Sequence, residues 1–183
     1  MIYVLCILLV VLGSIALIYN RFIRLDNMVK EAWSDVNVQL KRRYSLIPNL
    51  VETVKGHMKY EAKTLKEIVA ARNTAMHQST AAKKAESENQ ITESLHHLFA
   101  VAEQYPNLKS NEQFKELSSN LAEIENTLQV TRRYYNATVR DYNVALHSFP
   151  SNLVANCLNL KEKTYFEIAD SEAKEIQIKF DEK

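Results

Sequence analysis

The chain begins with an unbroken apolar run and then changes to a pattern in which apolar and polar residues alternate with a helical period. Residues Ile2 to Tyr19 carry no charged side chain, and as a helix they would extend about 27 Å at about 1.5 Å per residue. This length is close to the hydrocarbon thickness of a bilayer. A buried core helix is the weaker alternative, because no face of the run is polar. The pattern therefore predicts a transmembrane anchor over residues 1–20.

Positive charges follow this apolar run but do not precede it. Arg21, Arg24 and Lys30 come after the run, and only the terminal amine lies before it. A cleaved signal peptide would begin with a basic segment, so we expect the anchor to be uncleaved. The positive-inside rule then predicts an outside N-terminus and a cytoplasmic C-terminal domain. Cys6 and Cys157 have no pair spacing, which suits reduced thiols.

Beyond the anchor, apolar residues recur every three or four positions, the spacing of one face of an α-helix. The first such stripe continues across Pro48 without losing phase. Its members are Trp33, Val36, Leu40, Tyr44, Ile47, Val51, Val54, Met58, Leu65, Val69 and Met76.

Pro48 allows two interpretations of this stripe. Either one helix continues through a kink, or two helices meet at a corner. Proline removes a backbone donor and disfavours helical geometry in the preceding residue, but it is tolerated in the first turn of a helix. Ser45 could cap a new helix that begins at Leu46 and holds Pro48 in its first turn. We favour the corner, because one very long helix would have little to pack against.

Two further helices are predicted after a polar stretch. Residues 78–88 are small and polar, and we expect a connection or a frayed helix end there. A third helix follows over Ile91 to Tyr105. Ser110 stands three residues before Gln113, as in a capping box that opens a fourth helix, which Pro150 ends.

These elements predict an all-α fold in which an N-terminal transmembrane helix is followed by an antiparallel up-and-down four-helix bundle. We assign the bundle to residues 21–150 and a C-terminal tail, partly docked or mobile, to residues 151–183. Tyr165 and Phe166 are the expected anchors of that tail.

Composition agrees with long helices and excludes one class of partner. The chain has only two glycines and three prolines, so turns are few. Its formal net charge is +1, which supplies no overall field for nucleic acid, and we predict no nucleic-acid partner. Lys41 to Arg43 form a small basic cluster, which we interpret as a solvated helix face.

Polar residues form stripes beside the apolar face of two predicted helices. On the last helix the spacing is 7, 4 and 7 positions, which places the residues along one line. Two interpretations stay open: the residues fix helix register at the seam of the bundle, or they line a groove for a partner helix or peptide. In the second case Gly56 would allow another backbone to approach closely. The candidate residues are Asn49, Glu52, Gly56, Glu125, Arg132, Asn136 and Asn143.

Residues able to bind a metal are sparse. Glu93 and His96 form one Glu-x-x-His pair, whereas a di-iron bundle needs two such pairs. His57 and Glu61 lie one turn apart and could hold zinc only weakly. Glycine-rich phosphate loops and nucleophile motifs do not occur in the sequence. We therefore predict no catalytic residue, cofactor or metal.

Particular segments of the chain carry a family resemblance. "AWSDVNVQLKRRYSLIPNLVETVKG", "YPNLKSNEQFKELSSNLAEIENTLQVTRRYYNATVRDYN", "FPSNLVA" and "YFEIADSEA" follow one another in order. Together they strongly resemble the LemA family. The resemblance implies a bacterial protein with an N-terminal membrane helix and an antiparallel helical bundle, and we predict that it lies in the inner membrane. It implies little about activity, although some relatives are linked to magnetosome-vesicle biogenesis and others occur beside membrane metallopeptidases.

The sequence as a whole favours a membrane-anchored scaffold or adaptor for protein partners, with residues 2–19 in the membrane. Other membrane proteins are candidate partners. One alternative is a metal-dependent bundle enzyme that uses Glu93, His96, His57 or Glu61. The other is a structural protein that assembles into a homo-oligomer through its long amphipathic helices.

Overall fold

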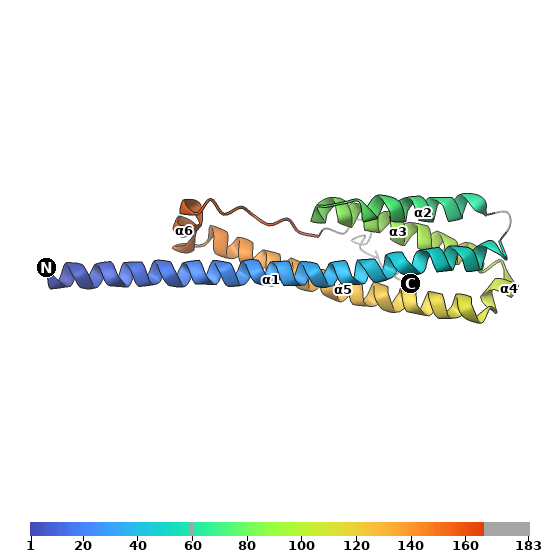
Figure 1. Ribbon diagram of the computed structural model, residues 1–183, viewed down its shortest axis with the longest axis horizontal. Helices are drawn as coiled ribbons and strands as arrows, with labels where there is room; N and C mark the ends of the chain where they lie inside the picture. Colours follow the sequence, from blue (N-terminus) through green and yellow to red (C-terminus); the bar gives the residue numbers. More distant parts are fainter. Residues whose placement is uncertain (59–60, 167–183) are drawn as a thin grey trace, which may run out of the picture.

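The computed structural model describes residues 1–58 and 61–166, and the only regular secondary structure in those ranges is α-helix. The predicted all-α class is therefore confirmed, together with the N-terminal apolar helix. Figure 1 shows the long helices α1, α2, α3 and α5 lying roughly parallel to one long axis. They are α1 (Ile2–Lys55), α2 (Ala62–Met76), α3 (Ala81–Ala102), α4 (Pro106–Lys109), α5 (Glu112–His147) and α6 (Ser151–Cys157).

The N-terminal part of α1 projects alone beyond the other helices (Figure 1). Within the described residues, α1 alone has a segment long and apolar enough to cross a membrane, and no other described residue covers that segment. The apolar side chains of this part are consequently exposed. From Phe22 onward α1 contributes buried residues at helical spacing, so the same helix passes from an isolated rod into a packed core.

The four long helices alternate in direction, with α1 beside α5 and α2 beside α3 (Figure 1). The closest helix contacts lie within these two pairs, and α2 contacts α1 less extensively. The α2–α3 hairpin covers the half of the α1–α5 pair that lies far from the apolar run. The helices therefore contact one another mainly as two pairs rather than as four equal neighbours.

The corner predicted at Pro48 is wrong, because α1 continues through Pro48 to Lys55. Proline at this position leaves the carbonyl of Tyr44 without its usual helical donor. Arg72 of α2 supplies a replacement, since its Nε donates to the Tyr44 carbonyl at 2.8 Å. Ser45 caps no new helix, and its hydroxyl donates to the carbonyl of Arg42 at 2.8 Å. The chain instead turns after Gly56 and resumes as α2.

Two other predicted boundaries also differ from the structure. Most of the polar stretch 78–88 is helical, because α3 begins at Ala81 and turns Ala85 and Glu88 toward the core. The N-cap of α5 is Asn111 rather than Ser110, and its side chain accepts from the amide of Phe114 at 3.0 Å. α5 ends at His147, ahead of Pro150.

The C-terminal segment returns along the α1–α5 pair after α6. Residues 158–166 run without regular secondary structure toward the α2–α3 hairpin (Figure 1). Phe166 is buried, as predicted, and Tyr165 is partly buried against the core. Trp33 of α1 contacts the rings of both Tyr135 and Phe166, with ring centroids 5.2 Å and 6.2 Å apart. The rest of the predicted tail, residues 167–183, lies outside the described residues, and the division into domains stays a prediction.

Candidate functional site

Charged side chains from three helices meet in the core of the domain. Arg43 of α1 is only 2% exposed. Its guanidinium donates to Glu88 of α3 at 3.2 Å and to the hydroxyl of Thr92 at 2.8 Å. It also lies 3.1 Å from a carboxylate oxygen of Glu125 on α5. One arginine therefore links α1, α3 and α5, and we name Arg43, Tyr44, Glu88, Glu125 and Arg132 the ionic cluster.

Burial shapes the electrostatics of the ionic cluster. Glu88 is fully buried, and its second carboxylate oxygen accepts a short hydrogen bond from the hydroxyl of Tyr44. Burial raises the pKa of Glu88, and the hydrogen bond from Tyr44 and the charge of Arg43 oppose that rise. The pKa of Tyr44 is raised by burial and then by the neighbouring Glu88 carboxylate. Tyr44 therefore stays a neutral donor, which leaves Glu88 with a partner for each oxygen.

Arg132 connects the ionic cluster to the C-terminal segment. Its Nη1 lies 3.8 Å from a carboxylate oxygen of Glu125. Its guanidinium also lies over the ring of Phe166, 4.9 Å from the ring centroid, in a cation–π arrangement. The buried end of the C-terminal segment therefore packs directly on a member of the ionic cluster.

Two asparagines of α5 hold the backbone of the C-terminal segment. Asn143 donates to the carbonyl of Lys163 and accepts from its amide, both at 2.9 Å. Asn136 makes the same pair of bonds with Phe166, at 3.0 Å and 2.8 Å. Between them, the hydroxyl of Tyr135 donates to the carbonyl of Thr164 at 2.9 Å. We name residues 158–166, which α5 holds in this way, the docked segment.

An ion pair fastens the docked segment to α1 as well. Lys163 Nζ lies 2.7 Å from Asp26, which also pairs with Lys30 at 2.6 Å. Burial alone would raise the pKa of Asp26, but the hydrogen bonds and charges of these two lysines outweigh it and lower that pKa. Asp26 is therefore held as a carboxylate between the two cations.

The structure thus brings together part of the stripe that the sequence singled out. Glu125, Arg132, Asn136 and Asn143 lie along α5 at the seam, where their partners are residues of this chain. Asn49, Glu52 and Gly56 do not join them, because all three lie exposed on the far part of α1.

Gly56 is exposed, with open space beside its Cα in the described part of the chain. A Cβ at Gly56 would meet only the carbonyl of Thr53, at 3.9 Å. Glu52 makes an exposed ion pair with Lys55 at 3.6 Å. These residues are consequently available at the surface rather than engaged in the seam.

A groove of about 560 Å³ opens between the last turns of α1 and the first turns of α2. Its lining is mainly apolar, with charged groups such as Glu52, Lys55 and Lys66 among the apolar side chains. We name it the α1–α2 groove, and Val51, Glu52, Lys55, Met58, Ala62, Leu65, Lys66, Val69, Ala70 and Asn73 line it.

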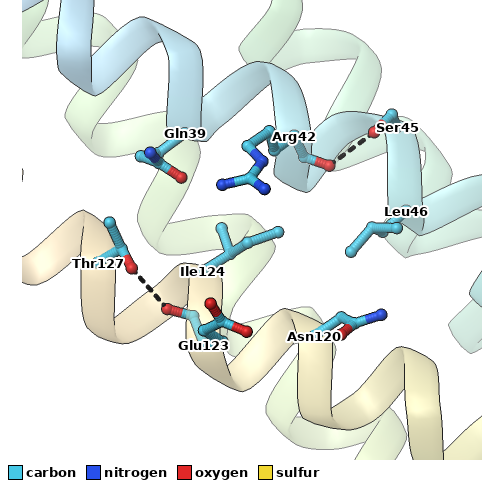
Figure 2. A pocket seen from close by; sticks show the side chains of 8 residues that line it. All are labelled: Gln39, Arg42, Ser45, Leu46, Asn120, Glu123, Ile124 and Thr127. Atoms are coloured by element: carbon cyan, nitrogen blue, oxygen red, sulfur yellow. Dashed lines mark hydrogen bonds between the residues drawn. The ribbon is translucent and has the colours of Figure 1, made fainter.

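A second, more polar hollow of about 250 Å³ lies between α1 and α5, as Figure 2 shows. The hydroxyl of Ser45 donates to the carbonyl of Arg42 of its own helix, and that of Thr127 donates to the carbonyl of Glu123, at 2.8 Å and 3.0 Å. These hydroxyls bond within their own helices, and the other polar side chains of the lining are Gln39, Arg42, Asn120 and Glu123. The hollow contains no cluster that resembles catalytic machinery.

The metal-enzyme candidates are dispersed. Glu93 and His96 are exposed on α3. His57 lies just after α1, where its Nδ1 is 3.2 Å from the carbonyl of Thr53, and Glu61 precedes α2. Over residues 1–58 and 61–166, no three His, Cys, Asp or Glu side chains gather so that they could hold a metal ion. The described residues offer this alternative no support.

The interpretation of Lys41 to Arg43 as a solvated face is wrong for Arg43, which is buried. Glu88 was likewise hidden in a stretch that we expected to be a connection. Both positions carried a usable signal: Arg43 falls between Leu40 and Ile47 on the apolar stripe, and Glu88 falls three residues before Ile91. A charged residue that keeps the helical spacing of a buried apolar stripe is expected to be buried itself. A buried charge in turn requires an oppositely charged partner.

Comparisons with known proteins agree with this architecture. The family model described as the LemA family matches residues 32–180. Protein LemA of Metamycoplasma hominis is 25% identical over 154 residues, which cover 84% of this chain and 70% of that protein. Magnetosome protein MamQ 1 of Paramagnetospirillum magneticum is 23% identical over 182 residues, with 85% and 67% covered. Magnetosome protein MamQ of Magnetospirillum gryphiswaldense is 22% identical over 174 residues, with 81% and 64% covered. The family match spans most of the chain, and the chain therefore belongs to the LemA family.

Proposed function

We propose that this protein is a membrane-anchored adaptor that binds an amphipathic helix of a protein partner in the α1–α2 groove. The N-terminal part of α1 is the anchor, and the cations that follow it support an outside N-terminus and a cytoplasmic domain at the bacterial inner membrane. The observation that carries the proposal is the position of the α1–α2 groove at the far end of the same helix.

The continuous α1 sets the reach of such an adaptor. From Tyr19 to Val51 the helix rises about 50 Å, at about 1.5 Å per residue. Because Arg72 compensates for Pro48, no corner interrupts this rise. The groove is therefore held at a fixed distance from the anchor, as a spacer between membrane and partner requires.

The chemistry of the groove supports a helical occupant. Two antiparallel helices form its sides, and Val51, Ala62 and Val69 give it an apolar surface. A third amphipathic helix can bury apolar residues at positions i, i+3 or i+4 and i+7 in such a groove. Charges of both signs, Glu52 and Lys66, lie beside this surface and would pair with a helix that carries both signs on its flanks.

The polar stripe on α5 does not carry the proposal. The docked segment already occupies Asn136 and Asn143, so a partner would have to displace it. Of the candidate stripe residues on α1, Glu52 lines the α1–α2 groove and is exposed.

Site-specific photocrosslinking of the full-length, membrane-anchored chain in cells tests the proposal. A photoreactive residue replaces Glu52, Lys66 or Asn73 in the groove, and Lys63, which is on α2 but outside the groove lining and 92% exposed at its side chain, is the matched control. We expect one product with a distinct protein from the groove positions and none from Lys63. Peptide mapping should place the crosslink in an amphipathic helix.

A second variant shows whether capture depends on the groove. Val69→Asp should abolish the crosslinked product, because the charge would have to be buried beneath the partner helix. Lys63→Asp should leave it unchanged. Crosslinks to a second copy of this chain would instead establish self-assembly, and crosslinks confined to one chain would overturn the adaptor.

A further inference from the structure

An uncharged stretch follows α5 at the end of the domain nearest the apolar run. Residues 148–160 contain no charged side chain and are bounded by His147 and Lys161. Several large apolar side chains in this stretch are exposed: Phe149 is 81% exposed, Leu153 57% and Leu158 42%. Such a concentration of exposed apolar groups marks an interaction surface.

The structure holds this stretch firmly in place. The hydroxyl of Ser151 donates to the carbonyls of Ala145 and Ser148, at 2.6 Å and 2.9 Å, and ties α6 to the end of α5. Ala155 is buried on the inner side of α6. Leu153 is therefore directed outward because the opposite side of α6 is packed against the domain.

The same stretch adjoins the end of the apolar run. Leu158 and Leu160 line a hollow of about 300 Å³ together with Tyr19 and Ile23 of α1. Figure 1 shows α6 beside α1, at the end of the domain from which the isolated part of α1 projects. The apolar surface of α1 therefore continues onto the stretch around α6.

We propose that residues 148–160 form a second membrane contact, in which Phe149, Leu153 and Leu158 enter the boundary between lipid headgroups and acyl chains. This inference rests on the proposed insertion of α1, but it does not depend on the adaptor role.

The apolar surface of residues 148–160 continues from that of α1, and we therefore identify lipid as the molecule that contacts it. If residues Ile2 to Tyr19 span the bilayer, its surface lies close to Tyr19, which shares a hollow with Leu158. Arg21, Arg24 and Lys161 are exposed near this level and can reach lipid phosphates. An element with exposed apolar groups and flanking cations is suited to lie in the interface plane.

The consequence is a fixed orientation of the domain. A single transmembrane helix allows the domain to tilt and rotate about its anchor. A second contact beside that helix restrains both motions. The α1–α2 groove at the far end would then be presented in one direction.

Depth measurement with fluorescent labels tests the second contact. The full-length chain is reconstituted in vesicles of phosphatidylethanolamine and phosphatidylglycerol that contain doxyl-labelled lipid. Cys6 and Cys157 are replaced by alanine, and one cysteine is introduced in turn by Leu153→Cys, Lys63→Cys or Leu9→Cys for labelling with an environment-sensitive fluorophore. We expect blue-shifted emission and several-fold greater lipid quenching at position 153 than at position 63.

Position 9 separates this inference from the anchor on which it rests. Strong quenching at position 9 with water-like emission at position 153 would overturn the second contact and leave the anchor intact. Water-like emission at position 9 would overturn both the second contact and the membrane anchoring of the proposed function. Adding Phe149→Ser and Leu158→Ser should reduce quenching at position 153, and unchanged quenching would contradict a role for these side chains.

Discussion

The α1–α5 pair is covered by two different structures, a helical hairpin over one half and the docked segment over the other (Figure 1). The α2–α3 hairpin satisfies its own backbone hydrogen bonds and reaches the pair through side chains, as Arg43 and Glu88 show. The docked segment has no regular secondary structure to pair its backbone groups. The side chains of Asn136 and Asn143 therefore form hydrogen bonds directly with its backbone. A helix can dock through side chains alone, whereas an irregular segment needs side chains that serve its amides and carbonyls.

The two coverings meet around Trp33. Its ring packs against Phe166 of the docked segment, and Lys84 of α3 lies over it with Nζ 6.0 Å from the ring centroid. Because the chain has a single tryptophan, fluorescence from Trp33 reports on this junction.

The largest expected effect concerns the ionic cluster. Glu88→Ala should destabilise the protein by about 3 kcal/mol, because it removes one partner of a buried ion pair. Urea unfolding in detergent micelles, followed by circular dichroism, measures the loss. Glu86→Ala on the exposed side of α3 is the control and should change stability little.

The paired replacement sharpens this prediction. Arg43→Met with Glu88→Leu should recover most of the lost stability, since both buried charges are then removed together. If Glu88→Ala alone cost no more than Glu86→Ala, the cluster would contribute nothing to the packing of the hairpin.

A smaller and local effect is expected at the docked segment. Asn143→Ala should weaken docking by about 2 kcal/mol, because the amide and carbonyl of Lys163 both lose their partner. Hydrogen exchange should accelerate at Lys163 and Phe166 and stay unchanged in α2 and α3. Asn126→Ala, at an exposed position of the same helix, is the control. Equal acceleration in the hairpin would show that the two coverings unfold as one unit.

Arg72 is an instructive exception, because it donates to a backbone carbonyl from within the hairpin. We expect Arg72→Ala to cost about 1 kcal/mol by leaving the Tyr44 carbonyl without its donor. In a Pro48→Ala background the backbone amide of residue 48 can serve that carbonyl again. A double-mutant cycle of urea unfolding free energies should therefore give a coupling of about 1 kcal/mol between the two positions. Additive effects would mean that Arg72 does not compensate for the proline.

The smallest effect concerns pH. The pKa of Asp26 is lower in the folded chain than its ordinary value of 3.8, so the ion pair with Lys163 stabilises docking above that value. This contribution, under about 1 kcal/mol, is lost as pH falls through the folded-state pKa. Trp33 fluorescence should therefore report weaker docking in acid. Asp26→Asn should remove the part of the pH dependence of docking that Asp26 causes. If the fluorescence transition in acid stayed unchanged in this variant, other carboxylates would be its cause.

Local pattern determined the elements of this protein. The uncharged run predicted a helix able to span a membrane, and three- and four-residue spacing predicted the buried faces of the later helices, because these signals depend only on neighbours in the sequence. The polar spacing on α5 also marked a seam before any partner was visible. Phe166 was an identifiable anchor because it is a large aromatic side chain in the C-terminal tail.

Tertiary structure decided which partner each residue met. Pro48 stays inside α1 because Arg72, distant in sequence, reaches the carbonyl that the proline leaves open. Arg43 is buried because Glu88 and Glu125 come from other helices to neutralise it. Asn136 and Asn143 of the α5 stripe bond to the chain's own docked segment. In each case the deciding contact joins residues far apart in the sequence, so helical periodicity could mark the position but could not name its partner.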